Sequence, residues 1–192
     1  MNFRESGMPA QDYWETLFDV PVVLDRFGFG PTTGDVAELG CGYGTFTIPL
    51  AHRIAGRVFG IDLEPSMVAA TKRRAQGAGL HNVNAAVQDV LIDGFGTAPG
   101  SCDAALLFNI LHCEEPVVVL RAAYDVVRPG GLIAVIHWRS DIATPRGPAA
   151  AIRPSPEQIL AWAAEIDGVA ASEPPFMLHP WHYGVSLRKI VR

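Results

Sequence analysis

The sequence has few of the features that mark disulfide scaffolds, membrane spans or nucleic-acid binders. Its three cysteines, Cys41, Cys102 and Cys113, form no Cys-x-x-Cys pair, which favours a reducing compartment over a disulfide framework. The net charge is −5 and no dense basic stripe occurs, so the pattern argues against nonspecific nucleic-acid or anionic-membrane binding. The longest apolar run, 104–111, contains Asn109 and is too short to span a bilayer.

The N-terminal residues lack the apolar core of a secretory signal, because Arg4, Glu5 and Asp12 interrupt them. With the free cysteines, this predicts a cytoplasmic protein. We expect a small-molecule substrate, no nucleic-acid partner and no membrane partner. The oligomeric state stays open.

Two common phosphate-binding signatures are also missing. A dinucleotide fingerprint would need glycine or alanine at position 45, where Thr45 stands, and no Gly-Lys-Ser/Thr follows the glycines. What is present is an apolar strand that ends in Gly40, Gly42 and Gly44 before a helix. Glycines tolerate positive φ and let a ligand approach the backbone, so this turn predicts a cradle for a small cofactor.

Acidic residues accompany that cradle at three places. Glu38 precedes the glycines, and Asp62 ends the next apolar segment, 57–61, about 20 residues further on, where a carboxylate can accept from both hydroxyls of a ribose. Asp89 follows a third apolar segment, 83–87, and is placed to accept from an adenine amine. The spacing therefore indicates a nucleoside-containing cofactor.

The chain reads as one α/β domain, 1–192, because 49% hydrophobic residues can bury one core and short apolar strands alternate with helical segments. Two amphipathic helices, over 9–18 and 21–27, predict a helical cap within residues 1–30. A proline-rich loop, 139–154, is expected at the rim of the site. Segments 170–178 and 183–191 are expected to close the sheet as two strands.

The ordered set of motifs from Val36 to Trp138 resembles the class I S-adenosylmethionine-dependent methyltransferases, and among them the small type 11 group that includes quinone-biosynthesis enzymes. The resemblance implies a Rossmann-like three-layer sandwich with a mostly parallel seven-stranded sheet and an antiparallel C-terminal hairpin. It also implies S-adenosyl-L-methionine as cofactor and methyl transfer to a small molecule by direct displacement. No metal site is expected.

The resemblance also assigns residues to the site. The cofactor-binding positions it implies are Glu38, Gly40, Cys41, Gly42, Gly44, Asp62, Leu63, Asp89, Val90 and Asn109. Asn109, His112 and His137 would lie beside the methyl group, at the ends of the fourth and fifth strands, and are the catalytic candidates. A histidine there is the natural general base for a protonated acceptor. His112 could equally be a rim residue, and for His137 a structural role in the core is the preferred interpretation.

Other polar residues leave alternatives open. Arg4, Arg139, Arg146 and Arg153 could hold an anionic group or be solvated loop charges. His179, Trp181 and His182 could suggest a metal site, but packing of the hairpin is the preferred interpretation, and Cys113 is interpreted as a small apolar filler.

Two other functions compete with methyl transfer. One is a nonenzymatic module that binds S-adenosylmethionine or S-adenosylhomocysteine. The other is a nicotinamide-dependent oxidoreductase, which Thr45 and the helices before the first strand disfavour. Within the methyltransferases, the segment 108–112 lacks the Asn/Asp-Pro-Pro-aromatic motif of amino-directed nucleic-acid enzymes, and the acids of metal-dependent catechol-type enzymes are also missing.

Overall fold

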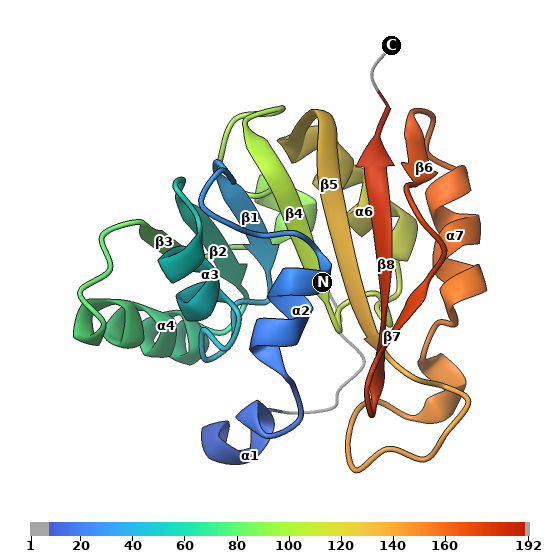
Figure 1. Cartoon of the computed structure of the whole chain (residues 1–192), viewed down its shortest axis with the longest axis horizontal. Coiled ribbons are helices and arrows are strands. Elements are labelled where there is room, and N and C mark those ends of the chain that lie inside the picture. The colour runs from blue at the N-terminus through green and yellow to red at the C-terminus, as the bar shows by residue number, and fades with distance from the viewer. Residues whose placement is uncertain (1–7, 191–192) are drawn as a thin grey trace.

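The computed structural model describes residues 8–190, which form a three-layer α/β sandwich (Figure 1). The strands run in the order β3-β2-β1-β4-β5-β8-β6, and β7 also pairs with β8. Their bounds are β1 (Val36–Leu39), β2 (Val58–Asp62), β3 (Val83–Val87), β4 (Cys102–Phe108), β5 (Val127–Trp138), β6 (Val169–Ala171), β7 (Phe176–Leu178) and β8 (His182–Lys189). The first five strands are parallel, and β8 is antiparallel to its neighbours.

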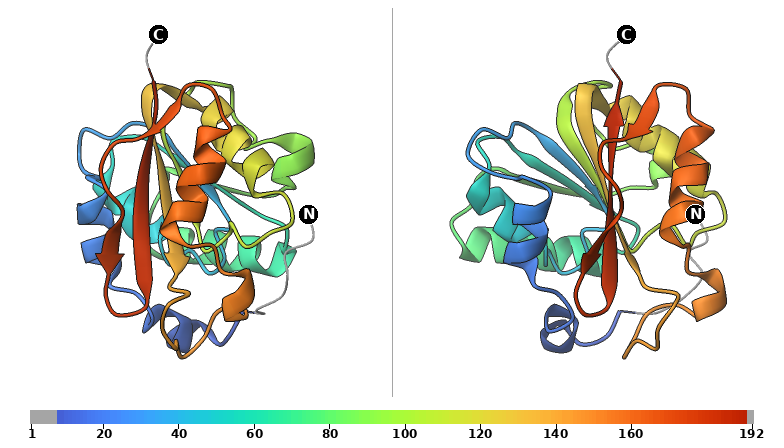
Figure 2. Two further views of the ribbon diagram at one scale, coloured as in Figure 1. Left: turned by 90° about the vertical axis from the view of Figure 1, so that its right-hand side faces the viewer. Right: turned by 45° about the vertical axis from the view of Figure 1, so that its right-hand side comes forward.

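Helices cover both faces of this sheet (Figure 2). Their bounds are α1 (Gln11–Glu15), α2 (Val20–Arg26), α3 (Thr47–Arg53), α4 (Pro65–Gly77), α5 (Val90–Asp93), α6 (Pro116–Val126) and α7 (Pro156–Ala164), with a 3-10 turn η1 (Ala150–Ile152). One buried cluster packs α6 and α7 on the sheet, and another packs α2 and α3 on the opposite face. No helix within residues 8–190 is both long enough and apolar enough to cross a bilayer.

The predicted α/β fold with a mostly parallel sheet is confirmed, and the differences lie at the two ends. The strand expected over 170–178 is divided into β6 and β7, so the sheet has eight strands and not seven. Pro174 and Pro175 lie in the break, and proline lacks the N–H that a continuous strand would need. The first N-terminal helix is also shorter than predicted, since α1 spans Gln11–Glu15, whereas α2 has the predicted length and begins one residue earlier, after its cap Asp19.

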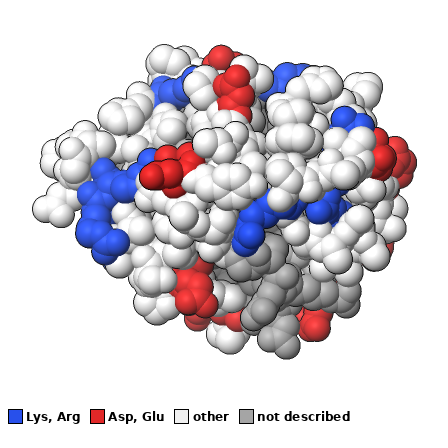
Figure 3. All heavy atoms as spheres, turned by 90° about the horizontal axis from the view of Figure 1, so that it is seen from below, with Lys and Arg blue, Asp and Glu red and all other residues white. Residues whose placement is uncertain are grey.

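The strand order places the predicted site at a reversal in the sheet. From β1 the chain first builds outwards to β2 and β3, and then returns to place β4 on the other side of β1. Ligands of open α/β sheets bind at the carboxyl ends of the strands beside such a reversal. The lower side of the molecule in Figure 1 is this carboxyl edge, and Figure 3, seen from below, shows basic and acidic side chains interspersed on it.

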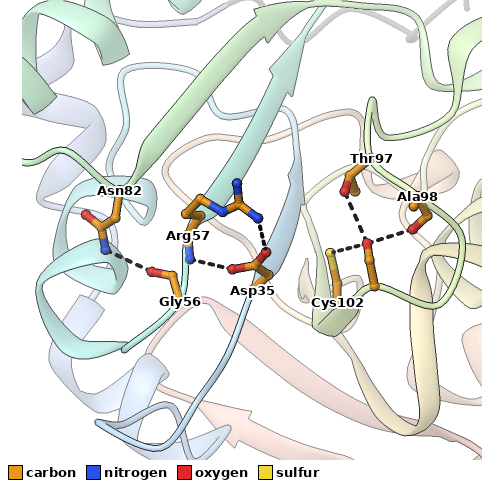
Figure 4. Close-up of polar contacts among 8 residues, drawn as sticks. Asp35, Gly56, Arg57, Asn82, Thr97, Ala98 and Cys102 are labelled. Carbon is orange, nitrogen blue, oxygen red and sulfur yellow. Dashed lines mark hydrogen bonds and ion pairs between the residues drawn. The ribbon is translucent and has the colours of Figure 1, made fainter.

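The opposite, amino edge of the sheet is fixed by hydrogen bonds between loops. Asp35 accepts from the backbone N–H and from Nη2 of Arg57, both at 2.8 Å, and thereby joins the starts of β1 and β2 (Figure 4). The side-chain amide of Asn82 donates to the carbonyl of Gly56 at 3.0 Å. These contacts hold three adjacent strands in register from the end remote from the site.

The close approach of two loops at this edge gives a first testable prediction. A Cβ on Gly56 would lie 2.1 Å from the carbonyl carbon of Gly34, so Gly56→Ala must displace backbone and should lower the free energy of unfolding by about 3 kcal/mol. A Cβ on Gly77, in the last turn of α4, meets nothing within 4 Å. The control Gly77→Ala should therefore raise the free energy of unfolding by about 0.5–1 kcal/mol. Urea denaturation measures both, and equal effects of the two variants would contradict the packing described.

Candidate functional site at the carboxyl edge

The glycine turn after β1 is fastened to the end of β2 through its backbone. The N–H groups of Gly40 and Cys41 donate to the carbonyl of Ile61 at 2.7 and 3.1 Å. Gly40, Gly42 and Gly44 have φ values of 76°, 54° and 78°, in the left-handed region that side chains disfavour. The alternating glycines are therefore required by the shape of the turn.

Asp62, at the end of β2, also organises this turn. Its Oδ2 accepts from the N–H of Gly42 at 2.9 Å and its Oδ1 from the N–H of Glu64 at 3.0 Å. A carboxylate has about four acceptor positions, so these bonds leave capacity for ribose hydroxyls. The carboxylate predicted to hold a ribose is therefore half-buried, fixed in position and able to accept further bonds.

Neighbouring side chains leave room at the turn only for glycine. A Cβ on Gly40 would lie 2.7 Å from Cδ1 of Ile110, the residue after Asn109. The buried hydroxyl of Thr71, on α4, donates to the carbonyl of Gly42 at 2.9 Å. The turn thus lies between α4 and the segment that follows β4, and it is itself mostly buried.

Glu38 lies beneath the turn, 2% exposed, and its Oε2 accepts from the hydroxyl of Thr47 at 2.5 Å. Burial raises the pKa of the Glu38 carboxyl to about 8, the negative charge of Asp62 adds to the rise, and the bond from Thr47 opposes it. Glu38 is therefore mostly protonated at neutral pH, and its side chain supports the turn from below.

The predicted cofactor residues Cys41, Leu63, Asp89 and Val90 occupy different environments. The thiol of Cys41 packs beside α4, and burial raises its pKa to about 12, so only the backbone of this residue can face a ligand. Asp89 Oδ1 accepts from the N–H of Leu91 at 2.9 Å and caps α5, in which Val90 is buried. Leu63 is half-buried directly after Asp62.

Asn109 combines a left-handed backbone with a buried side chain. Its φ is 59°, it is 9% exposed, and its N–H donates to the carbonyl of Ile136 at 2.8 Å. Both polar atoms of its side-chain amide are buried without a hydrogen-bond partner among the described residues, and so is the hydroxyl of Thr45 in the glycine turn. Buried orphan groups cost about 1–3 kcal/mol each, so these atoms are candidates to bond a polar group of a ligand at this edge.

The structure brings the two catalytic histidine candidates together. His112 Nδ1 lies 3.3 Å from His137 Nε2, and His137 Nδ1 lies 3.4 Å from the carbonyl of Trp138. Burial, with the nearby His112, lowers the pKa of His137 to about 3, so this ring is neutral. A carbonyl only accepts, so the assignment that satisfies both contacts puts the His137 proton on Nδ1 and leaves Nε2 to accept from His112 Nδ1–H. Neutral His112 then carries its lone pair on Nε2.

Two of the arginine candidates form hydrogen bonds within the loop 139–154. Arg153 donates to the carbonyls of Arg139, Arg146 and Pro148 and so holds the loop 139–154 together. Arg139 forms two hydrogen bonds with Asp141, at 2.6 and 2.9 Å. These two guanidinium groups therefore stabilise the loop predicted to lie at the rim of the site. Arg4 lies outside the described residues.

The N-terminal segment contacts the glycine turn directly. The Tyr43 hydroxyl donates to the carbonyl of Pro9 at 2.9 Å, and Arg74 bridges Glu15 of α1, at 2.6 Å, to the carbonyl of Tyr43, at 2.7 Å. The Cε of Met8 lies 3.4 Å from where a Cβ on Gly42 would be. Residues of the predicted cap thus lie against the predicted cradle.

The remaining candidates lie outside this arrangement. Cys113 is buried in the core beside α6, in agreement with the filler interpretation. His182 stacks on Phe18, with ring centroids 4.5 Å apart, and its hairpin neighbour His179 is exposed. Within residues 8–190, no three His, Cys, Asp or Glu side chains gather as metal ligands.

Sequence reasoning missed three residues that support the site: Thr47, Thr71 and Arg74. Thr71 had a readable signal, because Val68, Thr71 and Ala75 share one buried face of α4 at helical spacing. Thr47 lies nine residues after Glu38, and nothing in the sequence pairs the two. The contact of Arg74 with Glu15 joins residues 59 positions apart, which no local pattern predicts.

The buried Glu38 predicts an unusual pH dependence of stability. An unfolded chain ionises this carboxyl near 4.5, whereas the folded protein keeps the proton to about 8, so its contribution to stability falls as pH rises between these values. The Tm of Glu38→Gln, relative to the unaltered protein, should therefore rise from pH 5 to pH 8 in thermal melts. Exposed Glu165→Gln is the control, and an equal pH trend in both variants would refute the assignment.

Comparison with known proteins agrees with this geometry. Residues 36–131, half of the chain, match a family described as methyltransferase domain. Aklanonic acid methyltransferase DauC from Streptomyces sp. (strain C5) is 32% identical over 108 residues, 54% of this chain and 48% of that protein. A ubiquinone biosynthesis O-methyltransferase from Methylobacterium sp. (strain 4-46) is 31% identical over 110 residues, 56% of this chain and 43% of that protein. The chain spans under half the length of both relatives.

Solved structures agree on the fold. A SAM dependent methyltransferase from Aquifex aeolicus superposes with a TM-score of 0.81 at 21% identity, over 94% of both chains. The match to the family covers the glycine turn, Asp62, Asp89 and His112, and with it the expected cofactor class, S-adenosylmethionine, is confirmed. The chain belongs to the methyltransferase domain family, and it is a class I S-adenosylmethionine-dependent methyltransferase.

Proposed function

We propose that this protein transfers a methyl group from S-adenosylmethionine to a hydroxyl oxygen of a small molecule, with His112 as the general base. The observation that carries the proposal is the convergence of three features at one sheet edge. These are the glycine cradle with Asp62, the orphan amide of Asn109 and the paired rings of His112 and His137. The first suits a nucleoside cofactor, and the last suits an acceptor that must lose a proton.

The residues present fit the cofactor. The backbone at Gly40 and Gly42 would face its methionine part, Asp62 would accept from its ribose hydroxyls, and the segment at Asp89 and Val90 would lie along its adenine. The unpaired amide of Asn109 is positioned to bond a polar group of the cofactor. When bound, S-adenosylmethionine supplies a methyl group activated by a positively charged sulfur.

The protein's own contribution is alignment and proton removal. A displacement at carbon needs the acceptor oxygen held in line with the methyl group, and positioning of this kind can lower a barrier by ~7–11 kcal/mol. His112 Nε2 would receive the hydroxyl proton, and His137 Nε2 would hold the His112 ring through the bond to Nδ1. His137 is thus a positioning residue. The charge that develops on His112 is stabilised because a charged donor strengthens that bond.

The relatives support an oxygen acceptor. The matched relatives include a ubiquinone biosynthesis O-methyltransferase and a nocamycin O-methyltransferase. The nonenzymatic module is the weaker alternative, since a binding protein has no use for a buried imidazole that fixes the tautomer of its neighbour.

We also propose that the N-terminal residues 1–30 act as a helical cap and that the loop 139–154 forms the rim. The contacts of Tyr43 with Pro9 and of Arg74 with Glu15 support the cap, because they hold the N-terminal segment against the glycine turn. A reducing compartment such as the cytoplasm suits the free, buried Cys41, Cys102 and Cys113.

The activity is tested by measuring S-adenosylhomocysteine release with a panel of hydroxylated aromatic acceptors, including catechol and 2-naphthol. The proposal predicts turnover with at least one hydroxyl acceptor. In His112→Gln this turnover should fall ~10²–10⁴-fold, while the affinity for S-adenosylhomocysteine should not change. Full turnover in His112→Gln would show that His112 is not the general base.

The tautomer assignment gives a prediction that needs no acceptor. In ¹⁵N NMR spectra, His137 should be neutral at pH 5 with its proton on Nδ1, and neutral His112 should also carry its proton on Nδ1. In His137→Phe, which keeps a buried ring, the pKa of His112 should fall, because the acceptor that stabilises its charged form is gone. An unchanged His112 titration would show that His137 does not act on it.

A further inference from the structure

The middle of the glycine turn is held by three side chains from neighbouring elements. Asp62 accepts from the N–H of Gly42 at 2.9 Å, and the hydroxyl of Thr71 donates to the carbonyl of Gly42 at 2.9 Å. Nη1 of Arg74 donates to the carbonyl of the next residue, Tyr43, at 2.7 Å. The backbone at the centre of the turn is therefore fixed from β2 and, through two side chains, from α4.

The same nitrogen of Arg74 also bonds to the N-terminal helix α1. Nη1 donates to Oε1 of Glu15 at 2.6 Å, in an ion pair whose side chains are 30% and 33% exposed. Because one nitrogen donates both bonds, the direction of the Tyr43 carbonyl and the position of Glu15 are fixed together. Tyr43 adds a second connection, since its hydroxyl donates to the carbonyl of Pro9, just before α1, at 2.9 Å.

Few other contacts hold α1 in place. It has five residues and no buried side chain, and so short a helix is not stable in water by itself. Among residues 8–190, Glu15 is the only side chain of α1 that forms a hydrogen bond with another element. Trp14 adds ring contacts with Phe18 and Trp138, at 4.9 and 6.4 Å between centroids. Docking of α1 therefore depends on Arg74, and through it on the conformation of the glycine turn.

We propose that Arg74 is a positioning residue that couples occupancy of the glycine turn to docking of α1. A cofactor that fixes the turn also fixes the Tyr43 carbonyl, so Arg74 is already oriented for Glu15 and α1 docks with a smaller loss of conformational entropy. By linkage, docked α1 strengthens cofactor binding by the same factor. The cap thus closes in preference over a loaded cradle. The inference rests on the proposed function, because it takes α1 as part of the cap of the methyl-transfer site.

The test is calorimetric titration of the full chain and its variants with S-adenosylhomocysteine. Glu15→Ala, a change in α1, should weaken binding about threefold, and Arg74→Gln, which loses both bonds, about tenfold. The double variant should bind no more weakly than Arg74→Gln alone, because the two residues act through one contact. The control Arg128→Gln removes a 2.7 Å ion pair with Asp103 at the amino edge of the sheet and should bind normally.

Hydrogen exchange followed by ¹H–¹⁵N NMR separates coupling from a general loss of stability. The N–H of Trp14 donates to the carbonyl of Ala10 at 3.0 Å. Saturating S-adenosylhomocysteine should slow exchange of this N–H in the unaltered protein but not in Arg74→Gln. Unchanged affinity in Glu15→Ala, or equal slowing in Arg74→Gln, would overturn the coupling and leave the cofactor assignment intact. Failure of the unaltered protein to bind S-adenosylhomocysteine would overturn both.

Discussion

The hydrogen bonds between the glycine turn and the end of β2 are the contacts on which the candidate site depends. The carbonyl of Ile61 receives the N–H groups of Gly40 and Cys41, and Asp62 receives the N–H of Gly42. These bonds form only because β1 and β2 are parallel and in the observed register. They convert two loops into one rigid surface at the carboxyl edge, to which β4 and β5 add Asn109 and the two histidines.

Burial determines the charge states of two groups around this surface. Glu38 keeps a proton because its carboxyl is enclosed beside the charge of Asp62, whereas His137 loses one because its ring is enclosed beside His112. Glu38 is therefore neutral at pH 7, where an exposed glutamate would be charged, and His137 stays neutral at acidic pH, where an exposed histidine would be charged. Neutral buried groups can support neighbours by hydrogen bonding, and this is how Glu38 meets Thr47 and how His137 orients His112.

Most of the fold, and the order of the site along the sheet, could be predicted from the sequence. Glycine spacing and the acids after consecutive strands are local patterns, so Gly40, Asp62 and Asp89 could be placed in advance. The pairing of His112 with His137 could not, because it depends on how far each side chain reaches from adjacent strands. The division of β6 from β7 could have been predicted, since Pro174 and Pro175 lie in the break. The roles of the loop arginines could not be predicted, because Arg153 bonds to backbone carbonyls that no sequence pattern identifies.

The fold limits what the site can do but does not choose the acceptor. The glycine turn and Asp62 belong to the half of the chain that the family model matches, whereas the proposed cap and the loop 139–154 lie outside it. We therefore propose that recognition of the acceptor depends on these two segments.

Calorimetric titration of the full chain with S-adenosylhomocysteine, S-adenosylmethionine and NADH tests the central claim most directly. We predict saturable binding of both sulfur-containing ligands at one site and no heat from NADH. Binding of NADH alone, or of none of the three, would contradict the cofactor assignment and the function built on it.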